Sequence, residues 1–132
     1  MKDILDEMAD ILGSPQVLPP GYIFLLGGLD PTSDENTITL NPYNGDSNFW
    51  VPESSFSNFQ IGIYNTDMQQ AGIDAEKLRK YFSHINKRDC TSHRLLYCRA
   101  NHPNWVGTVL SAKNKSFHFF SLKLETRFVE KG

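Results

Sequence analysis

The sequence contains no long hydrophobic run. Its longest apolar stretch extends from Tyr22 to Leu26 and, through two glycines, to Leu29, whereas a helix needs about 20 apolar residues to cross a bilayer. The first thirteen residues carry four acids within their apolar pattern. They therefore do not resemble a secretory signal, which begins with basic residues followed by an apolar segment. We expect no membrane partner.

Cysteine is also scarce, because Cys90 and Cys98 are the only two in the chain. A domain of this size can form a stable core without a disulfide bond. Two thiols without an export signal are typical of a reducing compartment, where cysteines usually act as small buried apolar residues. The sequence therefore predicts a cytoplasmic protein.

Several motifs that carry catalysis or bind phosphate are missing. The sequence has no Gly-x-Ser-x-Gly nucleophile motif, and Gly27-Gly28 is not followed by the Lys-Ser/Thr pair of a phosphate loop. The run Asp30-x-Thr32-x-Asp34-x-Asn36 alternates oxygen ligands like a calcium loop. It lacks the glycine at position six and the glutamate at position twelve, where Asn41 stands. These absences favour binding over catalysis, and we expect no cofactor.

The composition is that of a folded protein. The 132 residues are 39% hydrophobic, 12% aromatic and 21% charged, which argues against a disordered chain and is typical of one globular domain. No repeat and no linker divides the sequence. We therefore expect a single domain spanning residues 1–132.

Two segments have the periodicity of amphipathic helices. In Asp3–Leu12 the apolar residues recur at helical spacing opposite the acids Asp3, Asp6, Glu7 and Asp10. A second helix is predicted to begin at Asp74 as its N-cap, with Ile73 and Leu78 as a hydrophobic staple. Its buried stripe is predicted to comprise Leu78, Tyr81, Phe82 and Ile85.

The remaining apolar segments predict strands. They are Tyr22–Leu26, Thr37–Leu40, Phe59–Tyr64, Arg94–Arg99, Trp105–Ala112 and Ser116–Val129, with a polar loop at Asn41–Ser57. Runs of strands interrupted by single helices are typical of the α+β class. We expect a two-layer domain with a mostly antiparallel sheet, an N-terminal helix, one central helix and a C-terminal three-stranded meander.

The charges divide unevenly along the chain. Residues 1–76 contain twelve acids and one base, a net charge of −11, whereas residues 77–132 contain twelve bases and three acids, a net charge of +9. Such asymmetry indicates either an interaction surface or two halves that pair within the fold. The sequence leaves both interpretations open.

The acidic half suggests a basic protein partner. Acids accelerate encounter with such a partner, and exposed tyrosine and tryptophan are common interface anchors. The candidate partner-binding residues lie on loops and are Asp30, Asp34, Glu35, Tyr43, Asp46, Trp50 and Glu53. The leading hypothesis is a small inhibitor- or immunity-like domain that neutralises its partner.

A short N-terminal pattern points the same way. Leu18-Pro19-x2-Tyr22-x3-Leu26, followed by Gly27-Gly28 and preceded by a short helix, resembles the opening of SUKH-type immunity proteins. The resemblance covers about twenty of the 132 residues and implies an immunity-like binding function. The later Pro/Gly-rich stretch and the C-terminal strands depart from that pattern.

The basic half supports nucleic-acid binding as an alternative. Its lysines and arginines are accompanied by Tyr97, Trp105, Phe117 and Phe119, and single strands bind to positive grooves that contain aromatic side chains. No helix-turn-helix or RNP-type signature is present, and aromatics at strand spacing usually belong to the core.

A second alternative is a hydrolase or nuclease site around Cys90, His93 and His102. The spacing Cys90-x2-His93-x4-Cys98-x3-His102 also offers four candidate zinc ligands, two thiols and two imidazoles, within thirteen residues. It lacks the glycine and the ligand order of a zinc knuckle. A regular strand would moreover point His93 and Cys98 to opposite faces. We therefore expect no metal site.

Overall fold

The computed structural model describes residues 3–30, 32–43 and 55–131. Within them the elements run in the order α1 (Ile4–Leu12), β1 (Ile23–Leu26), β2 (Thr37–Tyr43), β3 (Ser55–Asn65), α2 (Met68–Ser83), β4 (Asn86–Asp89), β5 (His93–Ala100), β6 (Asn104–Leu110) and β7 (Ser116–Glu130). The predicted α+β class with a mostly antiparallel sheet is confirmed. No helix in these ranges is long and apolar enough to cross a membrane.

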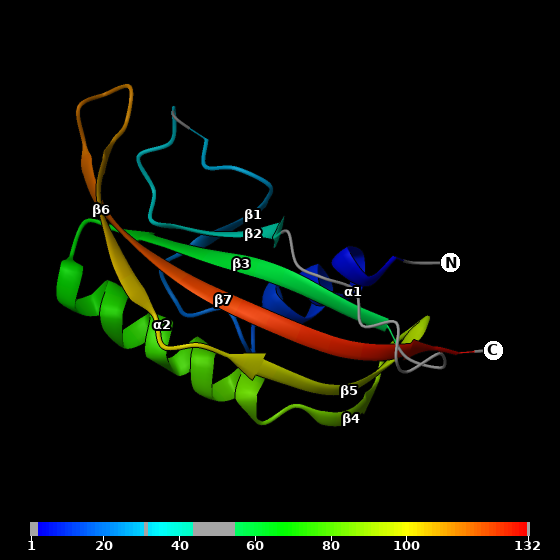
Figure 1. Ribbon diagram of the computed structural model, residues 1–132. Helices are drawn as coiled ribbons and strands as arrows, with labels where there is room; N and C mark the ends of the chain where they lie inside the picture. The colour runs from blue at the N-terminus through cyan, green and yellow to red at the C-terminus, as the bar shows by residue number, and fades with distance from the viewer. Residues whose placement is uncertain (1–2, 31, 44–54, 132) are drawn as a thin grey trace.

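The sheet is ordered β1-β2-β3-β7-β5-β4, with β6 attached to β7. Among the described strands, only β1 and β2 pair in parallel. The long strand β7 pairs along one edge with β3 and along the other with both β5 and β6 (Figure 1). The expected meander would place β6 between β5 and β7. Instead, β5 and β6 follow one another along the same edge of β7.

One face of the sheet carries the hydrophobic core. Ile61 and Ile63 of β3 and Leu122 and Leu124 of β7 are buried there, because alternate strand residues face the same side. Both helices contribute to this core and lie behind the sheet in Figure 1. Their core residues are Met8, Ile11, Leu12, Ala71, Ala75, Leu78 and Phe82.

The second helix begins earlier than expected. Its N-cap is Asp67, whose carboxylate accepts hydrogen bonds from the N–H groups of Gln69 and Gln70. The predicted cap, Asp74, lies within the helix and is buried, and Ile73 is 46% exposed, so the predicted staple is wrong. The predicted stripe is largely confirmed, since Leu78, Phe82 and Ile85 are buried and Tyr81 is half-buried.

Candidate functional site

The predicted acidic loop is partly neutralised by the basic half. The Asp34 carboxylate lies 3.3 Å from Lys113 Nζ. The backbone carbonyl of Asp34 accepts a hydrogen bond from Lys115 Nζ at 2.7 Å. Asp30 binds the backbone and hydroxyl of Thr32, and these hydrogen bonds lower the pKa of the Asp30 carboxyl. Asp34 therefore forms an ion pair between the acidic half of the chain, residues 1–76, and the basic half, residues 77–132.

Asp34 and Glu35 are brought together in one hollow. This hollow, about 400 Å³ in volume, also includes Tyr22, Asn36 and Lys115. Four other predicted residues lie outside what the structure describes. They are Asp46, Trp50, Glu53 and the side chain of Tyr43, whose backbone ends β2.

The cysteines and histidines do not form a zinc site. Both cysteines are free, and His102 is exposed in the connection between β5 and β6. In residues 3–30, 32–43 and 55–131, no group of His, Cys, Asp or Glu could hold a metal ion. The expectation that His93 and Cys98 face opposite sides is wrong. A register shift between Leu95 and Tyr97 turns both side chains toward the core.

Cys90 and His93 contact Glu7, and no pattern in the sequence predicted this contact. Glu7 was expected on the exposed acidic side of the first helix, but it is only 2% exposed. Its carboxylate accepts a hydrogen bond from the backbone N–H of Ser92, and it lies 3.6 Å from His93 Nδ1. Burial and this carboxylate raise the pKa of the Cys90 thiol to about 11. The cluster therefore favours a neutral thiol over the thiolate that nucleophilic catalysis requires.

Alkylation should reveal this neutral thiol. An ordinary cysteine with a pKa of about 8.5 is roughly a quarter thiolate at pH 8, so a pKa of about 11 predicts alkylation of Cys90 on the order of 200-fold slower. The rate should rise about tenfold per pH unit up to pH 10. Iodoacetamide labelling followed by mass analysis of the peptides that contain Cys90 and Cys98 measures it, with the denatured protein as control. A native rate within tenfold of the denatured rate would contradict the raised pKa.

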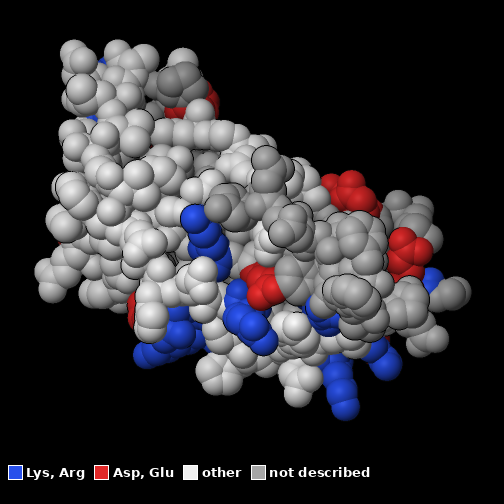
Figure 2. All heavy atoms as spheres, in the orientation of Figure 1, with Lys and Arg blue, Asp and Glu red and all other residues white. Residues whose placement is uncertain are grey.

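The face of the sheet opposite the helices carries several cations, an aromatic ring and Glu125, which lies opposite Arg99 in the register. Tyr97 lies between two arginines, 5.6 Å from the guanidinium of Arg99 and 6.0 Å from that of Arg127, and Arg127 Nε donates to its hydroxyl. Lys123 is exposed on the same face. Figure 2 shows Lys and Arg side chains gathered over the lower part of this view, with few acids between them.

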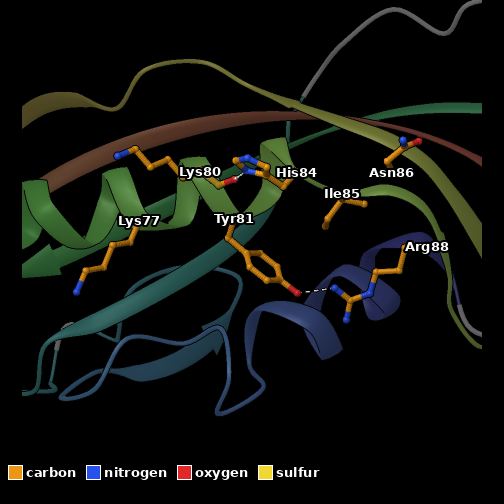
Figure 3. Close-up of a pocket in the computed structure, with 7 residues that line it drawn as sticks. All are labelled: Lys77, Lys80, Tyr81, His84, Ile85, Asn86 and Arg88. Atoms are coloured by element: carbon orange, nitrogen blue, oxygen red, sulfur yellow. Dashed lines mark hydrogen bonds between the residues drawn. The ribbon is translucent and has the colours of Figure 1, made fainter.

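A second cationic region lies where α2 meets β4. A hollow of about 540 Å³ is lined by Lys77, Lys80, Tyr81, His84, Ile85, Asn86 and Arg88. Arg88 donates a hydrogen bond to the Tyr81 hydroxyl. The side chains of Lys80 and His84 project from the other side of the helix (Figure 3). Because its cations do not converge, this hollow suits diffuse contact with an anionic surface better than capture of one phosphate.

The acidic counterpart is a groove between α1 and β1. It has a volume of about 520 Å³ and is lined by Asp6, Ala9, Asp10, Gly13, Ser14, Phe24 and Leu26. None of these residues is basic. Phe24 and Leu26 form an apolar wall, and Leu26 is 49% exposed. The groove therefore combines two carboxylates with apolar surface.

The N-terminal sequence explains how this groove forms. Asp3 caps α1, because its carboxylate accepts a hydrogen bond from the N–H of Asp6 at 2.8 Å. Asp6 and Asp10 are four residues apart and therefore lie on one side of this helix. Gly13 ends the helix, and a Cβ added there would lie 3.1 Å from the Phe24 ring. The glycine thus lets the end of α1 approach β1 closely. No basic residue occupies the last turn to balance the helix dipole.

Comparison with known proteins adds no assignment. Neither a protein-family model nor a curated protein matches this sequence.

Proposed function

We propose that this protein is a small inhibitor- or immunity-like domain that binds and neutralises a basic protein through the groove between α1 and β1. The observation that carries the proposal is the lining of this groove, in which the carboxylates of Asp6 and Asp10 lie beside the apolar side chains of Phe24 and Leu26. Apolar surface edged by charge is the usual composition of a protein interface.

The electrostatics of α1 support a cationic ligand. The carbonyl end of a helix carries partial negative charge, and in α1 no basic side chain of the last turn offsets it. Asp10 lies in this last turn, so its carboxylate is at the same end of the helix. A lysine or arginine of the partner would therefore be stabilised at this end of the helix.

The acids of the loop between β1 and β2 play a smaller part in this proposal. Lys113 reduces the attraction that Asp34 can exert on a partner. Asp30 follows Leu26 by four residues and so lies within about 14 Å of it along the chain. Asp30 and Glu35 would contribute long-range attraction, while the groove supplies the direct contact.

Capture followed by kinetics tests the proposal. The tagged protein is used to capture its partner from a lysate of its native cells treated with nuclease, and the captured protein is then assayed for association. Reversing both groove charges, D6K/D10K, should slow association about tenfold at low salt and reduce its salt dependence, because electrostatic attraction accelerates encounter.

The matched control reverses two loop acids instead. D30K/E35K makes the same change in net charge outside the groove and should slow association less. If D6K/D10K leaves association unchanged, or if D30K/E35K has the larger effect, the groove is not the binding site.

Nucleic-acid binding is the second candidate function. The half-buried ring of Tyr97, which lies near the guanidinium groups of Arg99 and Arg127, favours it, because single strands stack on aromatic rings flanked by cations. The same capture distinguishes the two functions. Bound material that disappears when nuclease is added supports nucleic-acid binding, whereas a stoichiometric protein that survives supports protein binding, which the charge-reversal variants then locate.

A further inference from the structure

The outer edge of β1 lies beside the acidic groove. In the described sheet β1 is the terminal strand and pairs only with β2. The N–H groups of Ile23 and Gly27 donate to the carbonyls of Asn36 and Leu40, both at 2.9 Å. Because backbone groups alternate along a strand, those of Phe24 and Leu26 point away from β2. Two donors and two acceptors therefore face outward next to the groove.

An open strand edge can accept another strand. Protein interfaces formed by strand addition obtain affinity from such backbone groups and specificity from alternate side chains. Phe24 and Leu26 lie opposite Ile38 and Leu40 in the register, so their side chains face the core side, where α1 also packs. Alternate side chains of an added strand would therefore enter the groove between β1 and α1.

The groove lining indicates which side chains would fit there. Lysine and arginine have long apolar stems and charged ends. From an added strand, their stems would cover Phe24 and Leu26 while their ends reach Asp6 and Asp10. A second copy of this chain would bring its own carboxylates against these carboxylates, and like charges oppose that pairing. The occupant is thus a different, basic chain.

We infer that the partner contributes an extended segment, with lysine or arginine at alternate positions, that adds to the sheet as a strand along β1. This inference rests on the proposed function and deepens it, because it defines how the groove is occupied. The backbone groups of Phe24 and Leu26 hold the segment, and Asp6 and Asp10 select its basic side chains.

A matched pair of variants tests the backbone contribution. Leu26→Ala removes the side chain and keeps the N–H, whereas Leu26→Pro also removes the outward N–H, which is not used in pairing with β2. The probe is a fluorescent peptide about ten residues long that alternates arginine and valine. We expect anisotropy to show binding weakened up to threefold by L26A and at least tenfold by L26P, with circular dichroism verifying the fold of each.

The peptide provides a second measurement that does not depend on folding of the proline variant. Two further peptides are made, one with methylated backbone nitrogens at its odd positions and one with methylated backbone nitrogens at its even positions. One of these two peptides should bind the unaltered protein at least tenfold more weakly than the unmethylated peptide. If L26P binds like L26A, or if neither methylated peptide is impaired, strand addition is wrong.

The two proposals fail separately. Loss of binding in D6K/D10K together with unchanged binding of both methylated peptides would retain the acidic groove and reject strand addition. Unchanged binding in D6K/D10K would reject the groove itself.

Discussion

Replacing Asp74 with alanine is expected to lower the free energy of unfolding by about 3 kcal/mol. Asp74 is 1% exposed, and its carboxylate accepts hydrogen bonds from the Tyr22 hydroxyl at 2.8 Å and from Gln70 Nε2 at 3.0 Å. The Tyr22 hydroxyl in turn accepts one from Asn65 Nδ2 at 2.8 Å. The alanine variant leaves the buried Tyr22 hydroxyl without its acceptor, and an unsatisfied buried donor is costly.

Asp67→Ala is the matched control for this variant. Asp67 caps the same helix from an exposed position, and loss of an N-cap costs about 1 kcal/mol. Urea unfolding followed by circular dichroism measures both free energies, which are comparable if the slopes agree. Equal losses for the two variants would show that the buried hydrogen bonds of Asp74 contribute no more than a cap.

Gly62→Val is expected to lower the free energy of unfolding by about 3 kcal/mol through steric overlap. A Cβ at this position would lie 2.5 Å from Thr39 Oγ1, 3.0 Å from the Tyr64 ring and 3.2 Å from the Phe119 ring. The two rings stack with centroids 4.5 Å apart and planes 5° apart. The glycine therefore lets Tyr64 lie flat along the sheet, and a branched side chain would displace it.

Gly28→Val serves as the control, because a Cβ at Gly28 meets no atom within 4 Å. Its free energy of unfolding should change by less than about 0.5 kcal/mol. Thermal and urea unfolding of the two variants can be compared directly. Removing the Oγ1 obstacle in G62A/T39A should also give a smaller loss than the sum of the single variants. Additive losses, or equal effects at the two glycines, would contradict the steric explanation.

The helices illustrate what local sequence patterns can predict. The first helix has an uninterrupted apolar period, and its boundaries were predicted to within a residue. The second helix contains Gly72, which resembles a break, and Asp74 follows as an apparent cap. The helix continues through both, and Asp74 accepts a hydrogen bond from Tyr22, which lies 52 residues earlier in the chain. Tertiary contacts of that kind leave no periodic signal.

The strands show a second limit. β4 was not predicted, since Asn86–Asp89 contains no apolar residue and is exposed throughout. Pairing with β5 through backbone hydrogen bonds defines it instead. Likewise, the bulge at Leu95 to Tyr97 breaks the alternation on which the expected positions of His93 and Cys98 depended.

The candidate groove could be predicted only in part. The acids of α1 were recognised from their spacing, although burial of Glu7 depends on Ser92 and His93, which lie more than eighty residues away. The apolar wall belongs to β1, and no local pattern indicates that β1 is an edge strand paired in parallel with β2. The groove therefore results from topology, which the sequence alone did not specify.

The position of β7 also affects when the protein can fold. Its partners β3, β5 and β6 all precede it in the chain, so the sheet cannot assemble until the ribosome has synthesised residues as far as Glu130. Before then β3 can pair only with β2, β5 can pair only with β4, and β6 has no neighbour in the described sheet. Nascent chains that end before Ser116 would expose open strand edges, which favour pairing between chains. Efficient synthesis of this protein should therefore depend on protection of those edges until β7 is complete.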